Sequence, residues 1–202
     1  MRIVHSAVVI TTFVATCCAN AQYADGTVKI GILSDMSSIY SDIGGPGSVI
    51  AAKLAIEDFR PAAKGMKVEI VSADMQNKPD VGVSIANTWF DVDKVDVIVD
   101  GMNSGVSLAV SEATRQKNKL FLVTGAATSD LTGPKCSPNT IHWVYDTWAL
   151  ANSTGKATVK TGGDTWFFIT ADYAFGYALE RDATAVIEAS GGKVLGRVRG
   201  TD

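Results

Sequence analysis

The chain is poor in the residues that bind metals or carry out covalent catalysis. It has two histidines and three cysteines in 202 residues, and beyond residue 21 only Cys136 and His142 remain. A protein zinc site takes three or four ligands, and Cys136 and His142 are too few to form such a site by themselves. No serine or cysteine stands in a recognisable nucleophile–base context. The sequence offers no catalytic constellation, and we expect neither an enzyme nor a bound cofactor.

Positive charge is also scarce. Lysine and arginine total 18 against 21 acidic residues, which leaves a net charge of −3 at pH 7. Proteins that bind nucleic acids gather Lys and Arg into patches, so this balance argues against nucleic acid as a partner. His142 lies in a short apolar stretch beside Trp143, where a structural position is expected rather than a general base.

The first 21 residues have the pattern of a cleaved signal peptide. Arg2 supplies the positive start, an apolar segment runs over residues 3–14, and Ala19-Asn20-Ala21 forms a small-x-small cleavage site. The alternative, an uncleaved anchor, is disfavoured because a membrane-spanning helix needs about 20 apolar residues. We therefore predict export from the cytoplasm. Cleavage leaves Cys136 as a lone cysteine, which is either free or separated from its disulfide partner.

Strand-like and helix-like segments alternate in the following part of the chain. Short apolar runs rich in β-branched residues predict strands, and apolar residues at helical spacing predict helices between them. This order predicts a Rossmann-like parallel sheet with helices on both faces. The predicted strands are 28–33, 68–71, 95–99 and 120–123, and the predicted helices are 47–59 (with Val49, Ala52, Ile56 and Phe59 on one face), a helix opening at Pro79, and 106–113.

A loop with two prolines at 134–139 interrupts this pattern. An extended segment at 140–144, a helix at 146–161, a strand at 165–170, a helix at 174–190 and a strand at 193–199 follow it. These elements predict only the beginning of a second α/β lobe, because so few elements do not close a core. We therefore expect a signal peptide over 1–21, a first lobe over 22–140, a crossing segment with a partial second lobe over 141–202, and a longer parent protein.

Polar loops follow three of the predicted strands, at 34–40, 103–107 and 124–130. Right-handed crossovers place these loops at one edge of a parallel sheet, where open α/β folds bind ligands. Their hydroxyls and backbone amides, without an acid–base pair, predict a site for a small polar ligand. The plain alternative for Ser104 and Thr128 is that they cap helices. A dinucleotide site after the first strand is disfavoured, because Ile50 stands where the glycine fingerprint needs its third glycine.

Several segments, taken together, resemble a known family. They are residues 28–34, the glycine-rich entry to the first helix and its end at 54–59, residues 125–132, and residues 171–176. Their order and spacing are similar to those of the periplasmic substrate-binding proteins of ABC transporters, specifically the branched-chain (hydrophobic) amino-acid-binding type with the type I periplasmic-binding fold. The resemblance extends over residues 27–200.

The resemblance implies a two-lobed protein of the periplasm that binds a small carboxylate-bearing solute in the cleft between its lobes. It also implies an ABC permease as the membrane partner and a monomeric state. Amino acids and aromatic acids are the implied ligands. The residues that match the family's ligand-binding positions are Tyr40, Asn103, Ser104, Gly105, Ala126, Ala127, Thr128 and Tyr173.

Two other functions stay open at this point. The same fold serves as the ligand domain of sensors and receptors, since fold does not fix function. An α/β enzyme for small molecules is the third and least favoured hypothesis. The aromatic cluster of Trp143, Tyr145 and Trp148 fits either packing of the crossing helix or an aromatic wall for the ligand.

Overall fold

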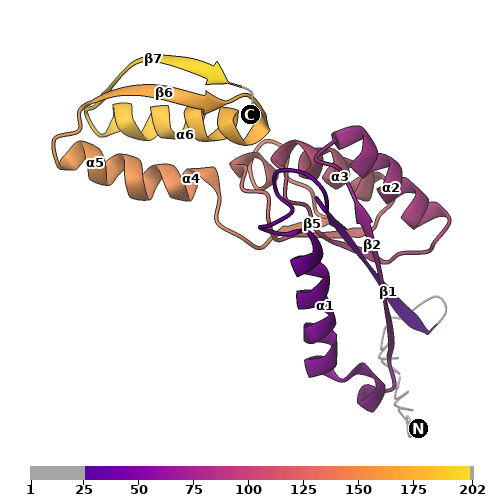
Figure 1. Ribbon diagram of the computed structural model, residues 1–202. Helices are drawn as coiled ribbons and strands as arrows, with labels where there is room; N and C mark the ends of the chain where they lie inside the picture. The colour runs from indigo at the N-terminus through magenta and orange to yellow at the C-terminus, as the bar shows by residue number, and fades with distance from the viewer. Residues whose placement is uncertain (1–25, 201–202) are drawn as a thin grey trace, which may run out of the picture.

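The computed structural model describes residues 26–200, so the predicted signal peptide lies outside the described residues. The chain forms two parallel sheets joined by a crossing segment (Figure 1). The first sheet has five strands in the order β2-β1-β3-β4-β5, and the second pairs β6 with β7. We call the first sheet and helices α1 to α3 the first lobe, and the elements from α4 to β7 the second lobe. The predicted parallel sheet followed by the beginning of a second α/β lobe is confirmed.

The first lobe alternates strands and helices, as the apolar periodicity predicts. β5 begins at the predicted end of this lobe and pairs with β4, so it extends the first sheet. The elements are β1 (Thr27–Ser34), α1 (Gly45–Phe59), the 3₁₀ turn η1 (Pro61–Lys64), β2 (Lys67–Asp74), α2 (Pro79–Asp91), β3 (Val97–Asp100), α3 (Ser104–Gln116), β4 (Leu120–Val123), the 3₁₀ turn η2 (Ser129–Leu131) and β5 (Thr140–His142).

Helices α2 and α3 cover one face of the first sheet and bury the main core. Val106 and Val110 of α3 pack there with Ile98 and Phe121 of the sheet, and all four are fully buried. Trp89 of α2 lies against β1 where Gly31 leaves room for its ring, since a Cβ at residue 31 would stand 2.5 Å from the ring. This face supplies most of the hydrophobic stabilisation of the lobe.

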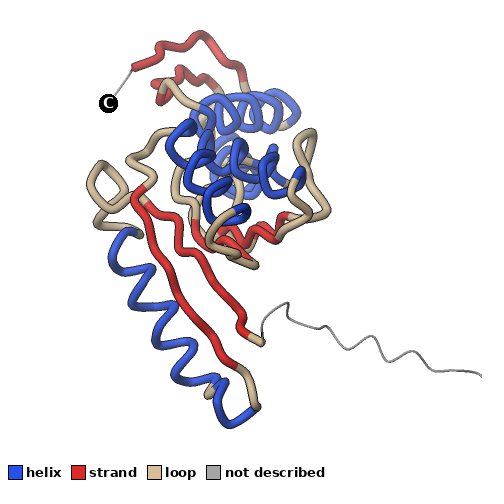
Figure 2. Tube along the Cα trace, turned by 90° about the vertical axis from the view of Figure 1, so that its right-hand side faces the viewer, coloured by secondary structure: helices blue, strands red, loops and turns tan. Residues whose placement is uncertain are grey.

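Helix α1 covers only the β1–β2 side of the opposite face. Figure 2 shows it beside these two long strands and apart from the other helices. The predicted apolar face of α1 does meet the sheet, because Ala52, Ile56 and Phe59 line a groove with residues of β1 and β2. Within α1, however, only Gly45 is buried, and Phe59 remains 46% exposed. This side of the sheet is therefore partly open.

The third strand is shorter at its start than the predicted 95–99. The N–H of Val95 donates to the carbonyl of Trp89 at 2.9 Å, which ties Val95 to the end of α2. The side chain of Asp96 accepts from the N–H of Lys29 at 2.9 Å. Both residues close the turn from α2, so the strand ladder begins only at Val97.

The second lobe packs one long helix between its sheet and the crossing helices (Figure 1). Its small core consists of the buried residues Ala151, Ala183 and Ile187 with partly buried neighbours. The outer face of β6 and β7 is apolar and exposed, with Ile169 at 86%. The elements are α4 (Thr147–Leu150), the π-helical turn η3 (Ala151–Gly155), α5 (Lys156–Lys160), β6 (Thr165–Ala171), α6 (Ala174–Ala189) and β7 (Lys193–Gly200).

The regular helix predicted over 146–161 is wrong in its middle. A π-helical turn separates α4 from α5. The hydroxyl of Ser153 donates to the carbonyl of Leu150 at 3.1 Å, and Gly155 ends the turn. Hydroxyls that bond backward to carbonyls compete with the regular ladder, and glycine adds freedom there. Among the helices of residues 26–200, none has the length and apolar content needed to span a bilayer.

Candidate functional site

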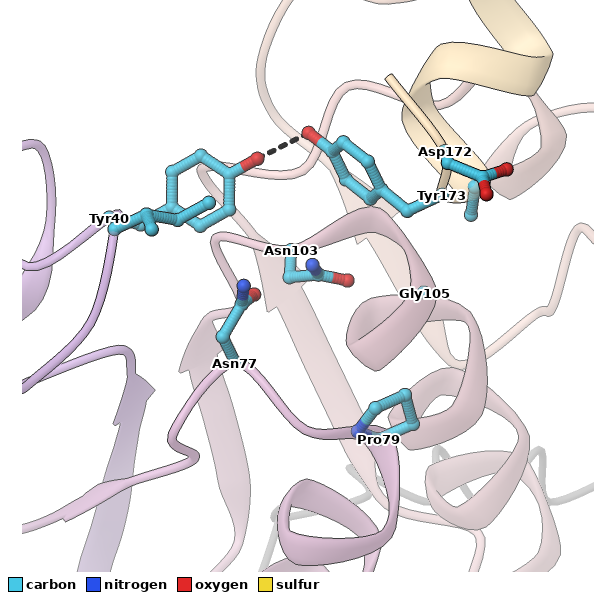
Figure 3. Close-up of a pocket in the computed structure, with 9 residues that line it drawn as sticks. Tyr40, Asn77, Pro79, Asn103, Gly105, Asp172 and Tyr173 are labelled. Carbon is cyan, nitrogen blue, oxygen red and sulfur yellow. Dashed lines mark hydrogen bonds between the residues drawn. The ribbon is translucent and has the colours of Figure 1, made fainter. Parts of the chain in front are cut away.

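The C-terminal ends of β1, β2 and β3 and the start of α6 enclose a pocket between the lobes. Its volume is about 480 Å³. Three βα loops of the first lobe form most of its wall, and the β6–α6 loop of the second lobe closes it (Figure 3). This is the sheet edge at which open α/β folds bind ligands. The lining residues are Ile39, Tyr40, Asn77, Pro79, Asn103, Gly105, Asp172, Tyr173 and Ala174.

Two aspartates hold the β1–α1 loop and so position Tyr40. The buried carboxylate of Asp35 accepts from the N–H groups of Ser38 and Tyr40, both at 3.0 Å. Asp74, at the end of β2, accepts from the N–H of Met36 at 2.9 Å and from the hydroxyl of Ser37 at 2.5 Å. Burial opposes ionisation of Asp74, but these hydrogen bonds outweigh it and lower its pKa. The loop is therefore fixed by charge-assisted hydrogen bonds.

The start of α3 provides donors for an anion. Asn103 caps the helix, and its side-chain oxygen accepts from the N–H of Val106 at 3.0 Å. The N–H groups of Ser104 and Gly105 precede the first intrahelical acceptor, so they have no acceptor within the helix. The hydroxyl of Ser104 is buried and has no partner among the described residues. Such a helix start attracts a carboxylate.

The second lobe closes the pocket with Tyr173. This residue precedes α6, and its hydroxyl hydrogen-bonds that of Tyr40 across the pocket (Figure 3). Gly176 allows α6 to begin against β6, because a Cβ there would stand 2.0 Å from the carbonyl oxygen of Ala171. Asp172 also lines the pocket and accepts from the hydroxyl of Tyr177, which raises the pKa of that tyrosine.

Polar side chains of α6 also hold the second lobe to the first. Asp182 accepts from the hydroxyls of Ser129 and Thr147, both at 2.6 Å. Arg181 pairs with Asp130 at 2.7 Å. These contacts join α6 to the η2 turn and fix the side of the pocket that Tyr173 occupies.

The predicted site residues divide into two groups. Tyr40, Asn103, Gly105 and Tyr173 come together in the pocket. Ser104 lies behind the pocket wall, since it is buried beside Asn103 without being part of the lining. The sequence left open whether Ser104 caps a helix. It does not cap α3, because Asn103 is the cap of that helix.

The three predicted residues after β4 lie outside the pocket lining. Ala126, Ala127 and Thr128 are buried. Thr128 caps η2 by accepting from the N–H of Asp130 at 3.3 Å. The carbonyl of Ala126 meets the ring nitrogen of His142 at 2.7 Å, and the carbonyl of Ala127 accepts from the N–H of Thr147 at 2.8 Å. A ligand role for these residues remains a prediction.

Sequence reasoning missed the loop between β2 and α2. It contributes Asn77 and Pro79 to the pocket. Its position was available from the sequence, because this loop also follows a strand and therefore lies at the same sheet edge. Ile39, Asp172 and Ala174, which are sequence neighbours of the predicted tyrosines, complete the lining.

The other residues considered from the sequence lie away from the pocket. Trp143, Tyr145 and Trp148 are 60–78% exposed, so they neither pack in a core nor form a wall of this pocket. Cys136 is exposed and free. No cluster of metal-ligating side chains is present within residues 26–200.

Comparison with known proteins settles the family. A family model described as "Periplasmic binding protein" matches residues 27–201. The chain belongs to the periplasmic binding protein family. This family supplies the solute-binding proteins of ABC transporters, which implies an extracytoplasmic location. No curated protein matches the chain.

Solved structures of the family match the fold. A periplasmic binding protein of Burkholderia mallei is 47% identical with a TM-score of 0.85, and covers 88% of this chain and 47% of its own. A periplasmic ligand-binding protein of a branched-chain amino acid ABC transporter from Burkholderia xenovorans is 40% identical with a TM-score of 0.74. This match covers 86% of the present chain and 46% of the Burkholderia xenovorans chain. A solute-binding protein from Rhodopseudomonas palustris, in complex with 3,4-dihydroxybenzoic acid, is 24% identical with a TM-score of 0.76. This match covers 86% of the present chain and 47% of the Rhodopseudomonas palustris chain, and it shows the shared fold. The chain thus spans about half the length of these periplasmic binding proteins.

Proposed function

We propose that this chain forms the ligand-capturing part of a solute-binding protein of an ABC importer. It binds a small carboxylate-bearing solute, an amino acid or an aromatic acid, in the pocket between its lobes. The protein acts outside the cytoplasm as a monomer and delivers the solute to a membrane permease without chemical conversion. The match to the periplasmic ligand-binding protein of a branched-chain amino acid ABC transporter from Burkholderia xenovorans supports amino acids as the first ligand class.

The single observation that carries this proposal is the unpartnered donor group at the start of α3. Gly105 lines the pocket, and the Ser104 hydroxyl lies directly behind this part of the wall without a partner among the described residues. A carboxylate satisfies these donors without a cationic side chain. The lining holds one charged residue, Asp172, and no lysine, arginine or histidine. This balance favours a zwitterion or monoanion over a polyanion.

The contact between Tyr40 and Tyr173 supports capture rather than loose surface binding. It joins the β1–α1 loop of the first lobe to the β6–α6 loop of the second, above the pocket (Figure 3). A ligand anchored at α3 lies below this contact, so closing of the lobes shields it from water. Closure of two lobes around a ligand is the motion on which such binding proteins depend.

Calorimetric titration with a panel of amino acids and aromatic acids tests this function. We expect binding of at least one carboxylate-bearing compound, and a loss of about tenfold in affinity in Ser104→Ala, since one hydrogen bond to a charged group is removed. The hydroxyl has no partner among residues 26–200, so we expect its removal to leave the stability of the protein unchanged.

Ser84→Ala is the matched control, because Ser84 is exposed on α2. Its affinity should equal that of the unmodified protein. Absence of binding across the panel, or equal affinities in Ser104→Ala and Ser84→Ala, contradicts the proposed function at this pocket.

A further inference from the structure

The side chain of Asn77, which lines the pocket, has a buried oxygen that no described residue satisfies. Asn77 lies between β2 and α2, and its side-chain oxygen is buried without a hydrogen-bond donor among the described residues. A buried acceptor left without a donor is destabilising. A donor from a bound molecule would satisfy it, since Asn77 lines the pocket.

The backbone of this loop is held independently of the Asn77 side chain. Gln76 and Asn77 both adopt the left-handed conformation, with φ of 52° and 55°. The N–H of Gln76 donates to Asp74 at 2.8 Å, and the N–H of Lys78 donates to the carbonyl of Met75 at 2.9 Å. Asparagine tolerates this conformation, but glycine suits it better. The turn therefore accounts for a small or amide residue at position 77, and not for a buried amide oxygen without a donor beside the pocket.

Asn103 supplies the complementary group from the neighbouring loop. Its oxygen accepts from the N–H of Val106, which fixes the orientation of the amide and leaves the NH₂ group as its donor. Figure 3 shows the amides of Asn77 and Asn103 below the contact between Tyr40 and Tyr173. One amide thus offers an acceptor and the other a donor.

We propose that Asn77 and Asn103 form a subsite that selects a hydroxyl group on the ligand. A hydroxyl donates one hydrogen bond and accepts others, so it matches the oxygen of Asn77 and the NH₂ of Asn103 at once. A carboxylate has no proton to donate, and an ammonium has no lone pair to accept. The subsite rests on the proposed function and adds a second determinant to the anchoring of the carboxylate at α3.

Matched ligand pairs test this subsite. Valine and threonine differ by a methyl and a hydroxyl group of similar size, and benzoate and 4-hydroxybenzoate differ by one hydroxyl. Calorimetric titration of the protein should give about tenfold tighter binding of the hydroxylated member in at least one pair. In Asn77→Gly this ratio should fall to about one, while the turn is retained because glycine adopts positive φ without steric strain.

Asn118→Gly is the matched control, because Asn118 has φ of 50° at the far end of α3. It should keep the ratio of the unmodified protein. Asn77→Asp retains an acceptor and adds negative charge, so it should weaken both members of a pair and preserve the preference for the hydroxyl.

The outcomes separate this inference from the proposed function. Binding without a preference for the hydroxyl, or a preference that persists in Asn77→Gly, overturns the subsite and leaves solute binding intact. Binding of other carboxylates from the wider panel with neither pair bound also overturns it. No binding by any compound overturns the proposed function and the subsite together.

Discussion

The two lobes meet at one pocket but are built to different degrees. The first buries a core of thirteen residues beneath a five-stranded sheet, whereas the second buries three beneath two strands. Three loops of the first lobe and one of the second line the pocket. In the proposed function, the well-packed lobe carries the anchoring groups, including Ser104 and Asn103, and the lightly packed lobe carries Tyr173, which covers them.

Equal substitutions in the two lobes should give the largest contrast in stability. Phe121 is fully buried in the first sheet, and Phe167 of β6 is 61% exposed. Phe121→Ala should lower the free energy of unfolding by about 3–5 kcal/mol, since it removes a buried ring and leaves a cavity. Phe167→Ala should change it by less than about 0.5 kcal/mol. Urea unfolding followed by circular dichroism measures both, and similar losses would remove the distinction between the lobes.

Acid should reveal a second difference, because the second lobe depends on a buried charge. Glu180 of α6 is 5% exposed, accepts from Thr170 at 2.6 Å, and pairs with Arg197. The hydrogen bond from Thr170 comes first among the causes that hold its pKa below 4.5, and Arg197 adds to it. A lowered folded-state pKa means that the stabilisation is complete above pH 4.5 and is lost as pH falls through the folded-state pKa.

Glu180→Gln should therefore destabilise the protein by about 1–3 kcal/mol above pH 4.5 and flatten its acid dependence. Glu112→Gln is the control in the first lobe. Its carboxylate pairs with Arg115 in solvent and has a pKa of about 2, so solvent screens the interaction and little change is expected. Unfolding curves between neutral pH and pH 3 measure the effect. An unchanged acid slope in Glu180→Gln would show that other groups set the acid sensitivity.

The contact between the lobes should give the smallest effect. Tyr40→Phe and Tyr173→Phe each remove one hydroxyl and with it the same hydrogen bond, so each should lower the free energy of unfolding by about 0.5–1 kcal/mol. The double variant should lose no more than either single variant, because the shared hydrogen bond is lost only once. Losses that add in the double variant would mean that the two hydroxyls act separately.

The alternation of strands and helices was predictable from the sequence, because apolar periodicity sets both the element type and the buried face. Phe121 and Val106 are buried where the pattern puts them. The π-helical turn at Ala151–Gly155 was not predictable, since its apolar spacing is close to that of a regular helix. The partly open face of the sheet beside α1 was not predictable either. The spacing of apolar residues shows which side of a helix is apolar, but not how much of the sheet that helix covers.

The site was predictable in position and only partly in its residues. Loops after parallel strands share one edge, and Tyr40, Asn103 and Gly105 do line one pocket there, while their contact with a ligand stays a prediction. Serine, threonine and asparagine serve equally as helix caps and ligand groups, so the sequence left the roles of Ser104 and Thr128 undecided. The structure makes Asn103 and Thr128 the caps, and it gives the Ser104 hydroxyl no partner within the described part of the chain.

Amide NMR of the isotope-labelled protein during titration tests the central claim, that the start of α3 holds the carboxylate of a captured solute. Valine and benzoate are the probes, and valinamide and benzamide are the matched compounds without a carboxylate. We expect the largest downfield shifts at the N–H groups of Ser104 and Gly105 with a carboxylate, and none with its amide. Unmoved signals at these two residues, while a carboxylate binds elsewhere on the protein, would contradict the account.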